Sequence, residues 1–89
     1  MRFTVELMPR AKRQAARIDA WWREHRPEAV EQFDQDLARL VASLVEHPDR
    51  EFARPGGRRA LITARTQHLA VYRVRRRARR VDVITIERP

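Results

Sequence analysis

The first residues of the chain alternate between polar and apolar side chains. In residues 2–8 every second side chain is apolar, which is the period of a strand with one buried face. From Pro9 onward the apolar residues instead recur at every third or fourth position, as they do along one face of an α-helix. We therefore predict a strand over 2–8 and a helix over 9–25. Pro9 suits the first helical turn, where its missing N–H leaves no helical hydrogen bond unmade.

A second helical pattern occupies residues 27–47. Pro27 separates it from the first helix, because the residue before a proline disfavours helical geometry and the proline itself suits a first turn. Acidic residues gather near the start of this helix, where their negative charge interacts favourably with the helix dipole. We assign Asp34 and Asp36 to the polar side of the helix. Pro48 ends the helix. The predicted apolar stripe consists of Val30, Phe33, Leu37, Leu40 and Leu44.

The second half of the chain is predicted to be a sheet. Residues 48–57 are rich in proline and glycine and indicate a loop, and β-branched and apolar residues follow over 59–64, 68–75 and 81–87. These three strands and the first one give an α+β fold in the order β-α-α-β-β-β, with a helical hairpin packed on a small antiparallel sheet. The expected core contains Ile18, Trp22, Phe33, Leu37, Leu40, Leu44, Tyr72, Val74, Val83 and Ile84.

Length and composition exclude several classes of protein. The 89 residues are expected to form a single domain, 1–89, because independent domains rarely fall below about 50 residues. Without cysteine, the chain can form no disulfide framework, thiol nucleophile or thiolate metal site. The longest apolar stretch has four residues, 69–72, whereas a membrane span needs about 20 and the core of a signal peptide about 7 to 15. We therefore expect a cytoplasmic protein.

Positive charge is concentrated in the second half of the chain. The formal net charge is +8, and residues 50–89 hold twelve arginines against three acidic residues, whereas residues 1–49 hold eight basic and nine acidic residues. Such a half attracts either an acidic protein segment or phosphates, and the sign of the charge does not distinguish them. The densest cluster, over 73–80, also suits a charged sheet edge that resists unwanted strand pairing.

No motif indicates a metal or a nucleotide cofactor. His25, His47 and His68 fall in different predicted elements and are interpreted as ordinary surface or capping histidines. Gly56 and Gly57 lack the preceding strand and following helix that a phosphate-binding loop requires. The sequence therefore predicts no cofactor and no metal site.

Three aromatic residues are assigned by their positions. Trp21 and Trp22 are adjacent in a helix and point about 100° apart, so that only one of them can face the core. We assign Trp22 to the core and leave Trp21 to cover a neighbour or to contact a partner. Tyr72, in the middle of a predicted strand, is expected in the sheet core with its hydroxyl at the margin.

The order and spacing of these segments resemble the RelE/ParE superfamily of toxins from bacterial type II toxin-antitoxin modules. The resemblance rests on the first strand running into 9–11, on the helical hairpin with its motifs at 27–30 and 44–48, and on the strand pair 69–74 and 81–86. It covers nearly the whole chain. It implies a small basic cytoplasmic toxin, neutralised by an antitoxin segment that wraps around it.

Two activities divide this superfamily, and the fold alone does not choose between them. RelE-like toxins cut messenger RNA on the ribosome, and ParE-like toxins act on DNA gyrase without an established catalytic site of their own. RelE-like nucleases carry an arginine where this chain has Leu69, and lysines where it has Ala60 and Ile62. The resemblance therefore favours the ParE-like branch. A RelE-like endoribonuclease and a non-toxic family member are the alternatives.

The resemblance, the positive charge of the second half and the outward position of Trp21 together indicate which residues bind or act. An acidic, apolar C-terminal segment of a cognate antitoxin is expected to fold on binding and to extend a sheet edge, giving a toxin-antitoxin hetero-oligomer. The candidate catalytic residues of the nuclease alternative are Arg65, Tyr72 and Arg88. The predicted partner-binding residues are Arg73, Arg75, Arg76, Arg79 and Trp21.

Overall fold

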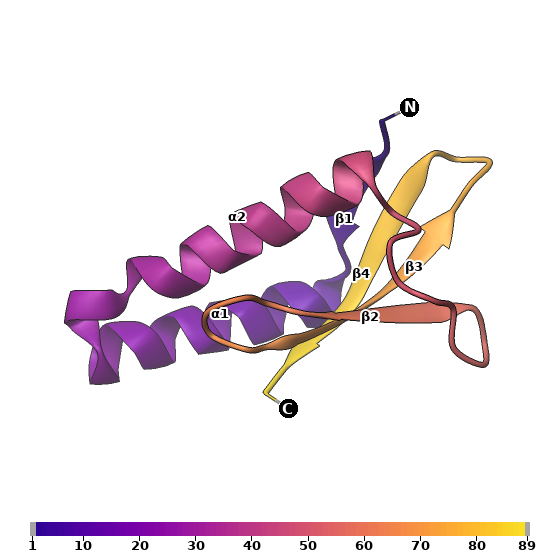
Figure 1. Cartoon of the computed structure of the whole chain (residues 1–89). Coiled ribbons are helices and arrows are strands. Elements are labelled where there is room, and N and C mark those ends of the chain that lie inside the picture. The colour runs from indigo at the N-terminus through magenta and orange to yellow at the C-terminus, as the bar shows by residue number, and fades with distance from the viewer. Residues whose placement is uncertain (1, 89) are drawn as a thin grey trace.

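The computed structural model describes residues 2–88, and its elements follow the predicted order β-α-α-β-β-β. Both helices and all four strands therefore occur where side-chain periodicity and β-branched, apolar content predict them (Figure 1). Within residues 2–88, no helix is long and apolar enough to cross a membrane. The elements are β1 Thr4–Leu7, α1 Pro9–His25, α2 Glu31–Glu46, β2 Arg58–Ile62, β3 Leu69–Arg75 and β4 Arg80–Glu87.

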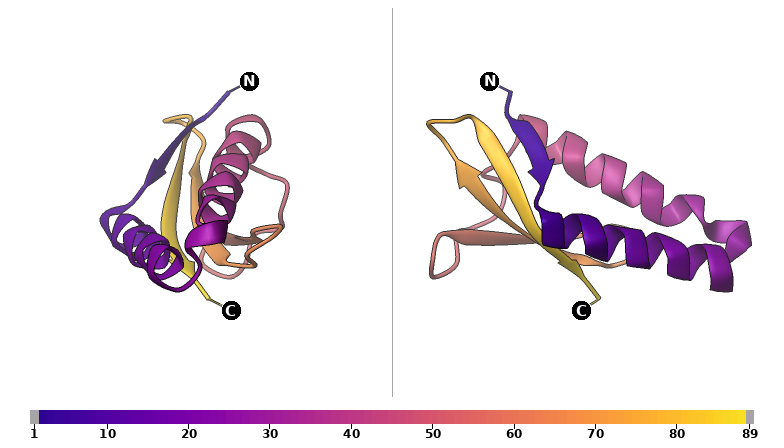
Figure 2. Two further views of the ribbon diagram at one scale, coloured as in Figure 1. Left: turned by 90° about the vertical axis from the view of Figure 1, so that its left-hand side faces the viewer. Right: turned by 180° about the vertical axis from the view of Figure 1, so that it is seen from behind.

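The connection between the helices differs from the prediction. Pro27 does not begin α2, because a 3₁₀ turn over Pro27–Ala29 comes first and α2 starts at Glu31. The backbone N–H of Ala29 donates to the carbonyl of Arg26 at 2.9 Å, which closes this tighter turn. The short turn allows the two helices to run side by side in opposite directions (Figure 2).

The sheet has the strand order β1-β4-β3-β2, so that the two edge strands are β1 and β2. β2, β3 and β4 pair in the predicted antiparallel manner. β1, however, lies parallel to β4, which makes the sheet mixed rather than wholly antiparallel. Short turns join β2, β3 and β4 and make these strands antiparallel. The direction of β1 relative to them depends instead on the long connection through the two helices. That connection returns the chain to the start of β1, where the Phe3 N–H donates to the Val45 carbonyl at 3.0 Å.

One face of the sheet packs against the helices. Five predicted core residues are buried and four more are half-buried against them, and only Ile84 does not join this cluster. Ile84 turns away because the pairing of β3 with β4 shifts by one residue beside Tyr72, so that Val83 and Ile86 share the helical face. The buried apolar residues are Ala11, Phe33, Leu40, Leu44, Ala70, Tyr72, Val81, Val83 and Ile86.

The molecule is elongated, with extents of 41 × 24 × 21 Å. The helical hairpin projects beyond the sheet, and the turn between β2 and β3 reaches back along the helices (Figure 1). This turn contributes residues to one hollow beside α1 and to another beside α2, and it organises the candidate site.

Candidate functional site

A buried carboxylate joins α2 to the turn between β2 and β3. Asp36 is 2% exposed. Its Oδ2 accepts hydrogen bonds from both the hydroxyl and the backbone N–H of Thr66, each at 2.7 Å. The backbone N–H of Arg65 is shared between the two carboxylate oxygens at 3.2 and 3.3 Å. One side chain of α2 therefore holds two consecutive backbone N–H groups of the turn.

The assignment of Asp36 to the polar side of its helix is wrong. Asp36 follows Phe33 by three residues and precedes Leu40 by four, and this spacing places all three on one face. Burial alone would raise the pKa of Asp36, but the hydrogen bonds donated by Thr66 and Arg65 together outweigh burial and lower its pKa. The side chain is therefore an ionised anchor, and helical spacing is the signal that reveals it.

His68 is also buried, at 4% exposed, which corrects its interpretation as a surface or capping histidine. Its backbone N–H donates to Thr63 Oγ1 at 2.8 Å, and its ring packs edge-on against Phe33 with 5.1 Å between centroids. Burial, and after it the positive charge of Arg88, lowers the pKa of His68. The imidazole is therefore neutral at about pH 7.

A hollow of about 230 Å³ lies beside His68, and we call it the tryptophan pocket. Trp21 is 37% exposed, stacks on His25 with 4.7 Å between centroids, and meets Trp22 edge-on at 5.6 Å. The guanidinium of Arg88 lies 5.0 Å from the centroid of the Trp21 ring, a cation–π contact. The pocket is lined by Arg17, Ile18, Trp21, Trp22, Thr66, His68 and Arg88.

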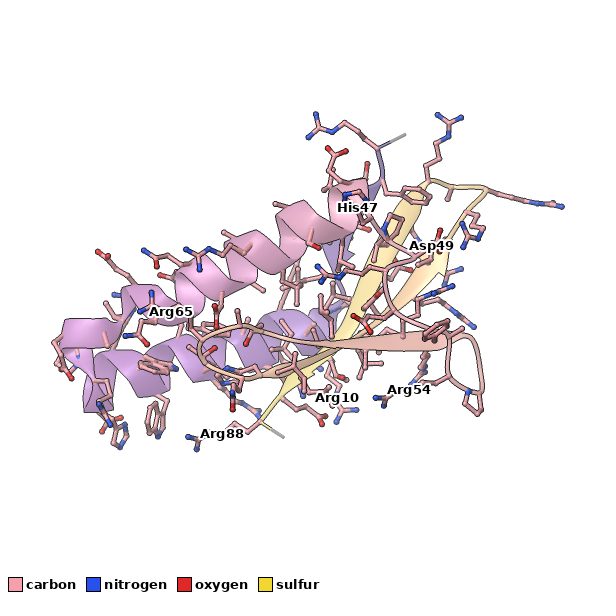
Figure 3. All side chains as sticks on the ribbon, in the orientation of Figure 1. Arg10, His47, Asp49, Arg54, Arg65 and Arg88 are labelled. Atoms are coloured by element: carbon pink, nitrogen blue, oxygen red, sulfur yellow. The ribbon has the colours of Figure 1, made fainter. Side chains whose placement is uncertain are left out.

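A second surface, which we call the β2 edge, runs along the unpaired side of β2. The Thr63 N–H donates to the His68 carbonyl, and the alternation of an antiparallel ladder then turns the backbone groups of Ala60 and Ile62 away from β3. Ile62 is 56% exposed. Hollows of about 150 and 420 Å³ border this edge, and four arginines line them or flank the strand: Arg39, Arg50, Arg54 and Arg58. Figure 3 labels Arg54 beside the start of β2.

The arginines predicted to bind a partner differ in their surroundings. Arg75 Nε donates to Asp82 Oδ2 at 2.6 Å, and Asp82 is 3% exposed. Arg76 forms a two-pronged pair with Asp49, one bond of which measures 2.9 Å. Within residues 2–88, the exposed Arg73 and Arg79 form no such ion pair. Internal carboxylates therefore already neutralise two of the four arginines.

The three candidate catalytic residues are not brought together. Tyr72 is fully buried, and its hydroxyl has no hydrogen-bond partner within residues 2–88 rather than lying at a polar margin. Burial raises the pKa of Tyr72. Arg65 reaches α2, where its Nη1 lies 3.4 Å from Gln35 Oε1, whereas Arg88 lies over Trp21 at the other side of the turn (Figure 3).

This chain is similar to known proteins in both sequence and fold. Residues 5–88 match the family model of the ParE toxin of the type II toxin-antitoxin system parDE. A chain of the chromosomal ParDE system from P. aeruginosa superposes with a TM-score of 0.79 at 21% identity, covering 97% of this chain and 95% of that one. A chain of the RelBE2 toxin-antitoxin complex from Mycobacterium tuberculosis superposes with a TM-score of 0.66 at 15% identity over all of both chains. No protein with a curated description matches in sequence.

Together with the family match, these superpositions show that the helical hairpin on a four-stranded sheet is the fold of the RelE/ParE superfamily of toxins. Within that superfamily, the match over 5–88 identifies the branch. The chain belongs to the ParE toxin family of type II toxin-antitoxin systems.

Proposed function

We propose that this chain is a single-domain cytoplasmic toxin that inhibits DNA gyrase and is neutralised by a cognate antitoxin. The family match over nearly the whole chain is the observation that carries the proposal. The neighbours in fold come from a ParDE system and a RelBE2 complex, which supports an antitoxin partner here as well.

The preference for gyrase over messenger RNA depends on what the site lacks. RNA cleavage needs a base for the 2′-hydroxyl, cations for the phosphate and an acid for the leaving oxygen. Leu69 occupies the position at which RelE-like nucleases carry an arginine, and Tyr72 lies in the core, out of reach of a substrate. A protein that acts by binding needs none of these groups.

A RelE-like ribosome-dependent endoribonuclease is the second candidate. His68, a neutral imidazole, lines the tryptophan pocket together with Arg17 and Arg88. A base next to two guanidinium groups is the kind of arrangement that phosphodiester cleavage uses. This arrangement is the observation that favours the alternative.

One experiment separates the two candidates. Purified toxin is added to a gyrase supercoiling assay, and the same preparation is added to a translation reaction whose messenger is mapped by primer extension. We expect inhibition of supercoiling and no new messenger ends. Ribosome-dependent cuts without an effect on supercoiling would replace our proposal by the alternative. Normal growth of a sensitive host on expression would instead indicate a non-toxic family member.

The β2 edge is the site that we propose for the antitoxin. A peptide strand can bind the outward backbone groups of Ala60 and Ile62, and the exposed Ile62 offers an apolar contact. Arg58 lies opposite Arg73 in the register and both are exposed, so acidic residues of the added strand would reduce their repulsion. Coupled folding costs a few kcal/mol, which a long interface can offset.

One predicted partner residue, Arg73, lies near the β2 edge, whereas Arg79 lies beside β1, where its carbonyl accepts from the Thr4 N–H. Because Arg75 pairs with the buried Asp82, its reversal would also disturb the sheet, and the cleaner variant is Arg73→Glu with Arg58→Glu, the exposed pair that faces each other at this edge. We expect it to weaken antitoxin binding by about tenfold or more and to reduce the salt dependence of binding. Arg13→Glu, an exposed change on α1, is the matched control. Unchanged antitoxin affinity combined with lost toxicity would assign these arginines to the target.

A further inference from the structure

The hydrogen bonds around Thr66 determine the tautomer of His68. The Thr66 hydroxyl has one hydrogen, and it must donate this hydrogen to Asp36 Oδ2, because an ionised carboxylate only accepts. Thr66 Oγ1 is therefore an acceptor toward His68 Nδ1, which lies 2.8 Å away and must carry the proton. Nε2 of the neutral ring is then left as a hydrogen-bond acceptor, and within residues 2–88 it has no partner.

The other polar groups of the tryptophan pocket are donors. Arg17 and Arg88 form no ion pair with a carboxylate within residues 2–88. The cation–π contact with Trp21 holds the Arg88 guanidinium at the pocket wall, which reduces the entropy that it loses on binding an anion. Ile18 and Trp22 supply the apolar wall. The pocket thus combines an acceptor, two cationic donors and an apolar surface.

The size and the packing of the pocket select among anionic ligands. Its volume of about 230 Å³ lies below the roughly 300 to 1,000 Å³ of sites that enclose a whole small molecule. A nucleotide base would need an open aromatic face, but the Trp21 ring is already stacked on His25 and covered by Arg88. A short peptide meets every requirement, because it offers a backbone N–H to His68, a carboxylate to the arginines and an apolar side chain to Trp22. Tryptophan and arginine are also the residues enriched at the energetic centres of protein interfaces.

We propose that the tryptophan pocket binds an acidic and apolar peptide segment of the protein that the toxin inhibits. This assignment rests on the proposed toxin function. It means that the target binds a separate surface of the toxin, on the α1 side of the β2–β3 turn. The β2 edge and its smaller hollow lie against α2 on the other side of that turn. The target and the antitoxin therefore contact different residues.

Peptide binding can be observed directly, because the chain has two tryptophans and both line the pocket. The probe is a capped tetrapeptide of alternating leucine and glutamate, titrated against the full chain with tryptophan fluorescence as the signal. We expect a saturable change, and a dissociation constant about tenfold higher for Arg88→Gln, which loses one charge-assisted contact. Arg13→Gln, one helical turn before Arg17, should bind as wild type does.

Three results would overturn the pocket assignment. They are the absence of a saturable change, equal binding of the same peptide with glutamine in place of glutamate, and tighter binding of adenosine monophosphate than of the peptide. The last result would instead make the pocket a nucleotide site.

Growth arrest on expression tests the assignment to the target without assuming which protein the target is. We expect Arg88→Gln to lose at least about tenfold of its potency, measured by the inducer needed for arrest, and to retain antitoxin binding. Undiminished arrest, or a parallel loss of antitoxin binding, would refute the assignment. A wild-type chain that arrests growth without inhibiting supercoiling would refute gyrase as the target and leave the pocket assignment standing.

Discussion

Removal of the Asp36 carboxylate is expected to be among the most destabilising single changes in this protein. In Asp36→Ala, the backbone N–H groups of Arg65 and Thr66 and the Thr66 hydroxyl all lose their acceptor. Without this anchor the turn between β2 and β3 keeps only the longer, exposed hydrogen bond from Arg65 to Gln35 of α2. Thr66 also loses the interaction that orients it toward His68.

The size of the effect follows from these bonds. A hydrogen bond to a charged group contributes about 1.5 to 3 kcal/mol, and a buried donor left without a partner costs about 1 to 3 kcal/mol. The turn is only partly buried, so water can replace part of what is lost, and we expect a net loss of roughly 3 to 5 kcal/mol. A domain of this length has a total stability of roughly 4 to 13 kcal/mol. The variant should therefore lose about a quarter or more of its stability, and nearly all of it where the total lies at the low end of that range.

Urea denaturation followed by tryptophan fluorescence and circular dichroism measures this loss. The matched control is Asp34→Ala, which removes an exposed carboxylate from the same helix. Asp36→Asn keeps one acceptor oxygen and should lie between the control and the alanine variant. A loss for Asp36→Ala within about 1 kcal/mol of the control would show that the hydrogen bonds are not the anchor that their geometry implies.

Two further predictions concern the core and the pH dependence. Leu44→Ala should lower the unfolding free energy by about 2 to 5 kcal/mol, because Leu44 is fully buried. Leu37→Ala should lower it by less, because Leu37 is only half-buried, and equal urea midpoints for the two variants would contradict this order. The folded-state pKa of His68 is lowered, so below its ordinary value of about 6.5 the unfolded state binds more protons and stability falls as the pH falls. We measure the urea midpoint between about pH 7 and pH 5, a window above the titration of the carboxylates. His68→Gln should reduce the decline of the midpoint over this window, and an unchanged decline would exclude His68 as the cause of the pH dependence.

Local patterns are sufficient to predict the elements, because periodicity defines both helices and β-branched, apolar content defines the three-stranded meander. The apolar and β-branched content of residues 68–75 predicts a strand, and the observed β3, Leu69–Arg75, lies one residue inside that prediction. The direction of β1 is a different kind of property. A strand of four residues has the same alternation in either direction, and its parallel pairing with β4 depends on a connection through two helices. No local signal in 2–8 carries that information.

In the candidate site, too, some features can be predicted from the sequence and others need the structure. The contact between Trp21 and Arg88 joins residues that are remote in sequence, so adjacency in a helix shows only that Trp21 is available for it. Asp36 is different, because its position on the apolar stripe already implies burial, and a buried carboxylate must find hydrogen-bond donors. The segment between two predicted strands offers them in its free N–H groups and in Thr66. Helical spacing and hydrogen-bond accounting together therefore predict an anchor from α2 to a turn, and only the identity of the turn needs the structure.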